Sequence, residues 1–385
     1  MSLKPSAIIL AGGYSSRMGE LKALLPMGKT TVLEQSICLF RSCGISDIVV
    51  VTGHRAPEVS AIAEQAGARP AHNPAFADGM YSSIRAGVQR LCATCSGFFL
   101  LPVDISLVRR GTVKLLLQAQ AQTPAQIFYP VFDDRRGHPP LLSAELIALI
   151  REEAAPEGGL RTLLAKLETD HPDHVREVQV ADANIHFDMD TPNDYFAGSI
   201  RFGRKGVPTM AEAEAIIDHI YSMPEKGLAH GRMVGDVASI LCATVIRHSG
   251  RELSPQTCRA CGLLHDIAKG HPHHEETGAA WLRELGFDQA AEIVAAHKDM
   301  QWTPEMGVGE RELVHLADKL VRGSRMIGVN ERFEEKLALY NHDPEAVQAI
   351  LSRYRLAQNL AAAVEAEVGQ PLELIMEMAF AACSH

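Results

Sequence analysis

The residues best suited to chemistry begin with a glycine-rich segment, residues 10–19 (LAGGYSSRMG), followed closely by Lys22. Glycine lets backbone N–H groups approach phosphate oxygens without interference from a Cβ atom, and Arg17 and Lys22 add positive charge. The segment matches neither the Walker A loop nor the GxGxxG fingerprint. We expect it to bind the phosphates of a nucleotide through the following residues: Leu10, Ala11, Gly12, Gly13, Ser15, Arg17, Gly19 and Lys22.

Two acidic residues are suited to hold a metal ion beside those phosphates. Asp104 directly follows the apolar run 97–103, and an Asp at the carboxyl end of a parallel strand lies in the ligand crevice of an open α/β sheet. Asp190 is the second candidate, and Mg²⁺ is bound by one or two carboxylates together with substrate phosphates. Alternatives stay open: Asp104 as a simple turn residue, Asp190 as an Asx turn before Pro192, and Asp188 as a rival ligand.

A second concentration of chemistry lies in the other half of the chain. Eight of the 17 histidines fall between His219 and His297. Among them, His265-Asp266 pairs an imidazole with a carboxylate, a ligand combination that suits Fe, Mn, Co, Ni or Zn. Asp266 has two oxygens and can bridge two ions, and Lys269 lies one helical turn later on the same face. Lys269 is therefore a catalytic candidate that would neutralise a phosphate oxygen or orient a ligand carboxylate.

The first half of the chain alternates short apolar runs with helical patterns, which predicts a mostly parallel sheet covered by helices on both faces, a Rossmann-like α/β domain. The predicted strands are 7–10, 47–52, 97–103, 126–131 and 175–180. The predicted helices are 31–43, 56–66 and 79–91. These elements would bring the glycine segment and Asp104 to the same edge of the sheet.

From about Met210 onward helical periodicity dominates and predicts an all-α domain. The predicted helices are 211–221, 233–247, 256–264, 276–285, 289–297, 311–320 and 343–368. Glycines and Pro208 mark the change of pattern as a linker. We therefore expect domains at residues 1–200 and 210–385, joined by a linker at 201–209. The mixed charge beyond Arg325 suggests bundle completion or a homodimer surface.

Several further motifs follow the glycine segment in order: 72–74 (HNP), 78–80 (DGM), Ser82-Ser83, 102–104 (PVD), 137–139 (GHP) and 188–192 (DMDTP). Together they resemble the molybdenum cofactor nucleotidyltransferases over about residues 5–200. The resemblance implies Mg-dependent transfer of CMP or GMP to a molybdopterin-type cofactor, with a molybdenum hydroxylase apoenzyme as partner. It adds four nucleotide contacts: Asp78, Gly79, Ser82 and His138. Capping or packing by Ser82, and loop shaping by His138, remain alternatives.

The choice of nucleotide stays open. Segments 51–55 (VTGHR) and 78–80 look closer to the cytidylyl branch of that family, whereas Ala11-Gly12-Gly13 is also typical of the guanylyl branch. The acceptor is open as well, because related domains activate sugar phosphates and other phosphorylated alcohols. We therefore expect CTP or GTP as the donor, with another phosphorylated acceptor as the alternative.

The order of His230, His265-Asp266 and Asp318 resembles the HD superfamily of metal-dependent phosphohydrolases over about residues 208–325. His274 and His297 match the additional ligand positions of two-metal members. The resemblance implies one or two divalent transition metals held by six residues: His230, His265, Asp266, His274, His297 and Asp318. The alternative is a nucleotide-binding regulatory module, with His273 as a rival ligand.

Composition excludes several other classes of function. The formal net charge is −10, whereas nucleic-acid binding usually needs a basic surface, so no nucleic-acid partner is expected. No apolar run approaches the roughly 20 residues of a membrane span, and none looks like a signal peptide. The eight cysteines fit reduced thiols, with Cys258 and Cys261 packed in the core. We expect a cytoplasmic enzyme with no membrane partner.

Overall fold

The computed structural model describes residues 4–152 and 157–383 of the 385-residue chain. It divides into two compact units, Met1–Lys205 and Gly206–His385. The segment predicted as a linker, 201–209, spans this boundary. Helix α7 (Pro192–Gly203) includes the first residues of this segment. Thr209, the last residue of the segment, is the N-cap of helix α8 (Met210–Ala215).

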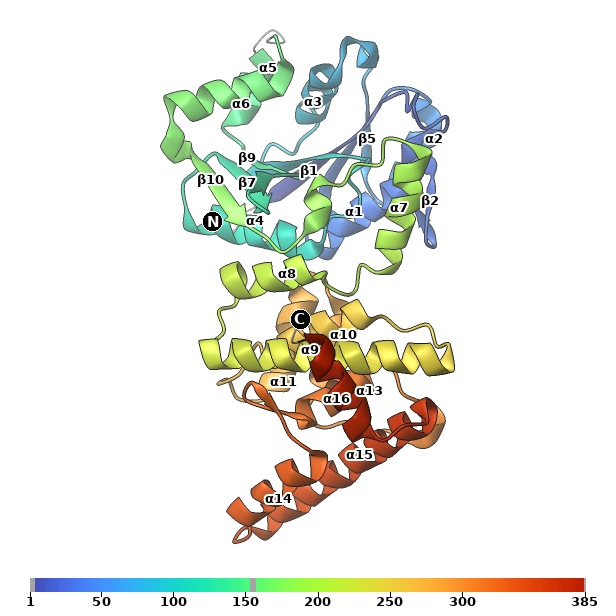
Figure 1. The fold of residues 1–385 in the computed structure, drawn as a ribbon. Helices are drawn as coiled ribbons and strands as arrows, with labels where there is room; N and C mark the ends of the chain where they lie inside the picture. The colour runs from blue at the N-terminus through green and yellow to red at the C-terminus, as the bar shows by residue number, and fades with distance from the viewer. Residues whose placement is uncertain (1–3, 153–156, 384–385) are drawn as a thin grey trace. The chain divides into compact units, whose positions relative to one another are not determined.

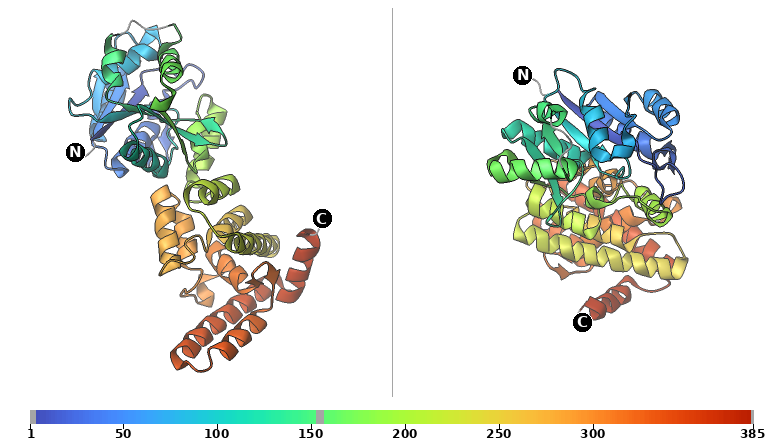
Figure 2. Two further views of the ribbon diagram at one scale, coloured as in Figure 1. Left: turned by 90° about the vertical axis from the view of Figure 1, so that its left-hand side faces the viewer. Right: turned by 90° about the horizontal axis from the view of Figure 1, so that it is seen from above.

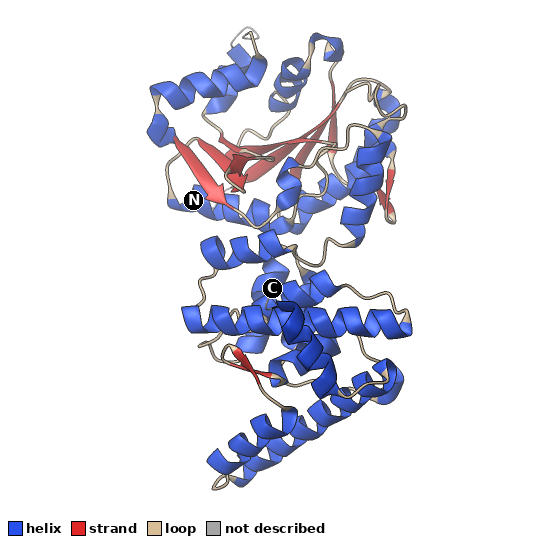
Figure 3. Cartoon of the chain, viewed as in Figure 1, coloured by secondary structure: helices blue, strands red, loops and turns tan. Residues whose placement is uncertain are grey.

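An eight-stranded mixed sheet forms the centre of the N-terminal unit (Figures 1 and 3). Its order is β10-β7-β9-β6-β1-β4-β5, with β8 paired to β7. Strand β1 lies parallel to β4 and β6, whereas β9 is antiparallel to β6 and β7. The prediction of a mostly parallel sheet is confirmed. The strands are β1 (Pro5–Ala11), β4 (Asp47–Thr52), β5 (Arg69–His72), β6 (Gly97–Pro102), β7 (Ile127–Phe132), β8 (Arg135–Arg136), β9 (Leu141–Ser143) and β10 (Val175–Gln179).

Helices cover both faces of this sheet because successive strand residues point to opposite sides. Figure 1 shows α3, α5 and α6 on one face and α1 and α4 on the other. On the first face Ile8 shares a buried cluster with Ile84 of α3. On the second, the rings of Phe40 and Phe99 lie 5.5 Å apart. The helices are α1 (Val32–Ser42), α2 (Ala56–Gln65), α3 (Met80–Val88), α4 (Arg110–Gln122), α5 (Leu146–Glu152) and α6 (Gly159–Asp170).

The structure adds elements that the patterns did not predict. Helices α4 to α7 are absent from the predicted set, as is the hairpin of β2 (Pro26–Met27) and β3 (Thr30–Thr31). The start of α7 carries a readable signal, since Thr191 and Asp194 form a capping box with Pro192 at the first helical position. The two-residue strands of the hairpin carry no such periodic signal.

The C-terminal unit is helical, as predicted. Its helices after α8 are α9 (Glu225–Ser249), α10 (Pro255–Leu264), α11 (His274–Leu285), α12 (Asp288–Ala295), α13 (Glu310–Lys319), α14 (Val329–Leu339), α15 (Pro344–Val368) and α16 (Leu372–Cys383). The predicted helices did not include α14 and α16, and three further details differ. The predicted helix 211–221 continues beyond α8 as a π-helical turn, Ile216–Ile220. Helix α9 begins at Glu225 rather than Met233, and a short hairpin, β11 (Val321–Arg322) and β12 (Arg325–Met326), follows α13.

Glycines allow α9 and α10 to pack at very short distance. A Cβ atom on Gly262 of α10 would lie 2.6 Å from the Cα of Gly235, and one on Gly231 of α9 would lie 2.5 Å from the carbonyl oxygen of Leu263. Real Cβ atoms essentially never show contacts this short, so both helices need glycine at these positions. The close packing carries His230, which precedes Gly231, towards the end of α10.

Helices α14 and α15 run side by side at the end of the helical unit (Figure 2). Helix α9 meets the length and composition of a membrane span, which the sequence analysis did not expect. Half of its apolar stretch is buried within the unit, as in a core helix. Cys258 and Cys261 are fully buried in α10, which confirms their predicted place in the core.

Candidate functional sites

The glycine-rich segment forms one wall of a cavity of about 280 Å³ at the carboxyl ends of the parallel strands. Six of the predicted nucleotide contacts in this segment line it, together with Gly79 and Asp104. The six are Leu10, Ala11, Gly12, Gly13, Ser15 and Lys22. The remaining two, Arg17 and Gly19, lie in the same loop but outside this lining. The glycine-rich loop thus borders the cavity, and nucleotide binding by its residues stays a prediction.

Gly12 and Gly13 of this loop serve different structural purposes. A Cβ atom on Gly12 would lie 3.3 Å from the backbone nitrogen of Gly53, because the loops after β1 and β4 cross closely there. The N–H of His54 donates to the carbonyl oxygen of Gly12 across that crossing, at 3.1 Å. A Cβ on Gly13, in contrast, would meet no described atom within 4 Å. Gly12 is therefore needed for packing, whereas Gly13 keeps the cavity wall open to a ligand.

Lys22 joins the two predicted metal-binding carboxylates. Its Nζ lies 2.9 Å from Asp104 Oδ2 and 2.5 Å from Asp190 Oδ1, and Arg17 adds a second cation 2.7 Å from Asp190 Oδ2. Lys22 outweighs the cost of desolvating Asp190, so the pKa of that carboxyl lies below its usual value. Asp190 stays mostly solvated, so water screens its ion pairs. The sequence assigned Lys22 only to phosphate, and its contact with both carboxylates was not foreseen.

Convergence of two carboxylates fits an Mg²⁺ site. Asp104 comes from the end of β6, and its backbone oxygen accepts a hydrogen bond from Met189, next to Asp190. This backbone contact holds the two acidic segments together independently of Lys22. Oxygen ligands from one or two carboxylates are what Mg²⁺ uses when substrate phosphates complete its shell. Asp188, the rival ligand, makes no hydrogen bond or ion pair in the described part of the chain.

Three other predicted contacts, Ser82, Asp78 and His138, lie outside the lining of the first cavity. The hydroxyl of Ser82 donates to the carbonyl oxygens of Ala75 and Gly79, each at 2.8 Å, and the neighbouring Ser83 lines the cavity. These bonds fit the alternative in which Ser82 caps or packs the loop before α3. Asp78 and His138 line a second cavity of about 630 Å³, which shares Gly79 and Met80 with the first.

The second cavity contains residues that the sequence analysis missed. Tyr129 from β7 and Arg161 from α6 line it, with Gly158 and Gly159 at the start of α6. Burial lowers the pKa of His138, so its imidazole is neutral at physiological pH, and its Nδ1 is buried without a hydrogen-bond partner among the described residues. A buried imidazole without a partner is available to a ligand. No periodic pattern marks these positions, because they come from separate segments.

In the helical unit, all six predicted metal ligands come together. His230 lies in α9, His265 and Asp266 follow α10, His274 begins α11, His297 follows α12, and Asp318 lies in α13. Two groups have ligand atoms within 4.8 Å of one another: His230, His265 and Asp266, and then Asp266, His274 and His297. Asp266 belongs to both groups, and Asp318 lies beside them, with its Oδ1 3.7 Å from His265 Nε2.

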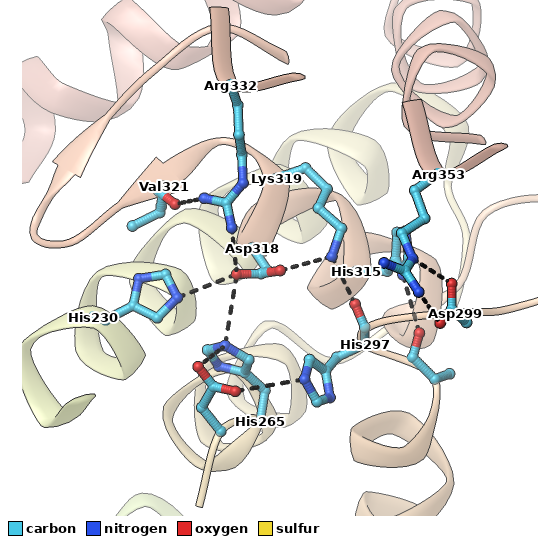
Figure 4. Close-up of polar contacts among 12 residues, drawn as sticks. His230, His265, His297, Asp299, His315, Asp318, Lys319, Val321, Arg332 and Arg353 are labelled. Carbon is cyan, nitrogen blue, oxygen red and sulfur yellow. Dashed lines mark hydrogen bonds and ion pairs between the residues drawn. The ribbon is translucent and has the colours of Figure 1, made fainter. Parts of the chain in front are cut away.

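The backbone fixes how the imidazoles face this centre (Figure 4). The Nδ1 atoms of His230, His265 and His297 lie 3.1, 2.7 and 2.6 Å from the carbonyl oxygens of Gly323, Gly262 and Val294, respectively. A carbonyl only accepts, so Nδ1 carries the proton in each neutral ring and Nε2 presents a lone pair. Three lone pairs therefore point into the centre.

These lone pairs face carboxylate oxygens, an arrangement that a cation would stabilise. His230 Nε2 lies 3.1 Å from Asp318 Oδ1, His265 Nε2 lies 3.5 Å from Asp266 Oδ2, and His297 Nε2 lies 3.6 Å from Asp266 Oδ1. Two ligands on one tetrahedral metal ion at a bond length of about 2.1 Å lie about 3.4 Å apart. The separations match that value. The residues present therefore fit a divalent transition-metal centre.

Charges around the centre keep its carboxylates ionised. Burial alone would raise the pKa of Asp266, but its contacts with His265, His297 and Lys269 outweigh burial and hold the pKa far below the usual value. Asp318 is likewise held ionised by Lys319, whose Nζ lies 2.7 Å away, and by Arg332 at 3.4 Å (Figure 4). Lys269 forms a short ion pair with Asp266, so it touches the carboxylate as predicted.

The remaining histidines lie outside this centre. His315 is fully buried, its Nδ1 lies 3.0 Å from the carbonyl oxygen of Ala296, and burial lowers its pKa to about 3. His315 is therefore a neutral residue of the core. His273, the rival ligand, precedes α11 with a left-handed backbone and is exposed. His274 takes the place in the ligand group instead.

Comparison with known proteins finds a family match in each of the two units. A model of the MobA-like NTP transferase domain matches residues 7–173, and a model of the HD domain matches residues 227–323. The molybdenum cofactor cytidylyltransferase of Escherichia coli is 29% identical over 197 residues, which cover 51% of this chain and 95% of that protein. A probable molybdenum cofactor guanylyltransferase of Mycobacterium avium is 30% identical over 179 residues, covering 43% of this chain and 82% of that protein.

Among solved structures, Rv0371c from Mycobacterium tuberculosis is similar to this chain, with 25% identity and a TM-score of 0.44 over 52% of this chain and 100% of that one. The two domain models and the curated relatives place the glycine-loop cavity in one matched region and the cluster of imidazoles and carboxylates in the other. This chain belongs to the MobA-like NTP transferase family through its N-terminal unit, and its helical unit carries an HD domain.

Proposed function

We propose that the N-terminal unit transfers CMP or GMP from CTP or GTP to a molybdopterin-type cofactor and releases pyrophosphate. The observation that carries this proposal is the convergence of Asp104 and Asp190 on Lys22 at the cavity of the glycine loop. The relatives named above support the choice of acceptor. We further propose that the enzyme works in the cytoplasm and hands its product to a molybdenum hydroxylase apoenzyme.

In this reaction a phosphate oxygen of the acceptor forms a bond to the α-phosphorus. The bond from that phosphorus to the bridging oxygen breaks, and its electron pair leaves with pyrophosphate. Lys22 and Arg17 are placed to donate to the phosphate oxygens on which negative charge accumulates. Mg²⁺ held by Asp104 and Asp190 would supply the neutralisation of charge that such a transfer needs. Positioning is then the main task of the protein.

We assign the second cavity to the acceptor. It adjoins the glycine-loop cavity through Gly79 and Met80, so a ligand in it can reach a nucleotide in the other. Arg161 offers a cation to the acceptor's phosphate, and the neutral His138 offers a hydrogen-bond partner to its polar groups. The volume of about 630 Å³ is within the range of small-molecule and cofactor sites.

The test is pyrophosphate release from CTP and from GTP in the presence of Mg²⁺ and molybdenum cofactor. We expect release with one of the nucleotides, and a loss of about 100-fold or more in Asp104→Asn. Asp134→Asn makes the same chemical change in an exposed turn of the same unit and should retain full activity. Release only with a sugar phosphate would support the alternative acceptor, and no release with either nucleotide would refute the assignment.

We propose that the helical unit hydrolyses a phosphate ester or anhydride, with one or two divalent ions of Fe, Mn, Zn, Co or Ni held by its imidazoles and carboxylates. The inward-facing Nε2 atoms and the shared carboxylate of Asp266 support this activity. Bound ions would activate water, and Lys269 beside Asp266 is placed to neutralise a phosphate oxygen. Metal analysis and a phosphatase screen of wild type and Asp266→Ala test the proposal. Equal activity in the two would leave a nucleotide-binding regulatory role.

A further inference from the structure

A cavity of about 970 Å³ adjoins the metal centre of the helical unit, and its lining includes the metal ligand His230 together with Lys269. We call it the cationic pocket because of its charged lining. Five cationic side chains line it against a single acidic one, Glu335. The five are Lys226, Lys269, Arg322, Arg332 and Lys336. The chain as a whole carries a formal net charge of −10, so this local excess of positive charge runs against the overall composition.

The partners of these cations show which charges are available to a ligand. Lys269 pairs with Asp266, Arg322 pairs with Glu335, and Arg332 lies 3.4 Å from Asp318. Lys226 and Lys336, in contrast, form no ion pair within the described residues. Two ammonium groups that share a pocket without a carboxylate partner favour an anion there, because like charges destabilise one another.

The pocket combines the HD fold with an extension of it. Lys226 comes from the first turn of α9, where Pro224 provides no side-chain cap and the helix dipole favours an anion. Arg332 and Lys336 come from α14, four residues apart and therefore on one face of that helix. Helix α14 lies beyond residue 323, where the match to the HD domain ends. The chain thus adds its own cationic wall to the metal centre.

Helix α14 is held firmly in this position. Its Phe333 is buried and stacks on Tyr354 of α15 at 5.0 Å, and the hydroxyl of Tyr354 donates to Asn330 at 2.8 Å. The guanidinium of Arg332 reaches both Asp318 and the carbonyl oxygen of Val321 (Figure 4). Arg332 therefore ties the cationic wall directly to a predicted metal ligand. The wall and the metal centre form one site.

The lining also has an apolar part. Met223 and Pro224 precede α9, and Ala338 and Leu339 end α14. Leu339 is 66% exposed, so its side chain is accessible to pack against a ligand in the pocket. A pocket with phosphate-binding cations and apolar rim residues suits an organic molecule that carries a chain of phosphates.

We propose that the cationic pocket binds organic polyphosphates, with one phosphate at the metal centre and the next contacted by Lys226 and Lys336. This inference rests on the proposed hydrolase activity of the helical unit and names its substrate class. In the reaction, water forms a bond to the phosphorus at the metal centre. The bond from that phosphorus to the bridging oxygen breaks, and the proton lost by water goes to the leaving phosphate.

A substrate with a single phosphate would leave part of this site unused. Lys269 and Arg332 already adjoin the carboxylates of the metal centre and suffice for one phosphate there. Lys226 and Lys336 form no ion pair with the described residues, so their positive charge is available to a second phosphate further along the substrate. We therefore expect selectivity for polyphosphates over monoesters.

The test compares hydrolysis of ATP, inorganic tripolyphosphate and p-nitrophenyl phosphate by the full-length protein loaded with Mn²⁺. The measured quantity is the ratio of kcat/KM for ATP to kcat/KM for p-nitrophenyl phosphate. Lys226→Ala and Lys336→Ala should each lower this ratio by about tenfold, because each variant loses one charged hydrogen bond to the second phosphate. Lys336→Arg should restore the ratio. Arg247→Ala in α9 and Arg355→Ala in α15 remove exposed cations outside the pocket and should leave the ratio as in wild type.

The outcomes separate the inference from the proposed function. An unchanged ratio in both lysine variants, with hydrolysis still dependent on Asp266, would overturn the polyphosphate pocket alone. Preference for tripolyphosphate over ATP would overturn the role of the apolar rim. If the wild-type protein hydrolyses none of the three compounds, the hydrolase proposal fails, and calorimetry of ATP binding tests the pocket alone. An ATP-binding site that is present in wild type and lost in the double variant Lys226→Ala/Lys336→Ala would support the pocket. Equal ATP binding by wild type and the double variant would overturn the inference as well.

Discussion

Replacing Gly262 with alanine should separate the two helices that bring the metal ligands together. The added Cβ atom would lie 2.6 Å from the Cα of Gly235, whereas ordinary contacts begin at 3.4 Å. Both atoms belong to the main body of a helix, so no flexible side chain can move aside. Helices α9 and α10 must therefore part by about 0.8 Å to restore an ordinary contact.

This displacement is large compared with the tolerance of a metal site. Ligand distances in such sites hold within about 0.2 Å, and His230 comes from α9 whereas His265 and Asp266 follow α10. Overpacking of this kind also costs about 2 kcal/mol of unfolding free energy. We expect Gly262→Ala to lose metal from the first ligand group and to be less stable than wild type.

Metal content per chain by mass spectrometry, together with urea unfolding of metal-free protein, measures both effects. Gly227→Ala is the matched control in α9, because its Cβ would lie 3.6 Å from the nearest described atom, Met223 Cε. Alanine favours a helix over glycine, so this control should retain metal and lose no stability. If Gly262→Ala keeps the metal content and unfolding midpoint of wild type, close packing of α9 and α10 does not set the ligand geometry.

Three further predictions concern the cluster of imidazoles and carboxylates and Asp182, a buried carboxylate of the N-terminal unit. Asp266→Ala should abolish metal binding because both ligand groups share this residue, whereas His274→Ala should remove only the ion of the second group. Metal titration followed by mass spectrometry distinguishes the two outcomes. Asp182→Ala should destabilise the N-terminal unit by about 3–5 kcal/mol, because this buried carboxylate accepts hydrogen bonds from Arg109 and Thr112. Urea unfolding measures the loss of stability, and a loss below about 1 kcal/mol would contradict the prediction. Chelation of the metal should lower the melting temperature of the helical unit and leave the melting temperature of the N-terminal unit unchanged. The reason is that the ligands join five segments of the helical unit alone. Calorimetry of the chain with and without EDTA measures both transitions.

The cluster of imidazoles and carboxylates was predictable because its members carry their chemistry in their residue types. His265 and Asp266 are adjacent, and the other four ligands follow at the positions that the HD resemblance implies. Asp104 was predictable for a different reason, since the end of a buried parallel strand fixes its place at the ligand edge of the sheet. In both cases local sequence determines the position of the functional group.

Features that depend on packing between distant segments could not be predicted in the same way. The contact of Lys22 with Asp104 and Asp190 joins three segments, and nothing at Lys22 itself signals it. Ser82 and Ser83 differ only in which side of α3 they face, and a shift of one residue exchanges their roles. The second cavity and the cationic pocket are lined by elements far apart in sequence, so Arg161, Lys226 and Lys336 carry no local pattern.

The central claim is that each unit holds divalent ions against phosphate, the N-terminal unit with two carboxylates and the helical unit with carboxylates and imidazoles. Anomalous diffraction at the manganese edge, from crystals of the full-length protein grown with Mn²⁺ and CTP, tests it most directly. We predict one peak within coordinating distance of both Asp104 and Asp190, and two peaks on either side of the carboxylate of Asp266. Peaks elsewhere, or no peak between Asp104 and Asp190 with the nucleotide bound, would contradict the account.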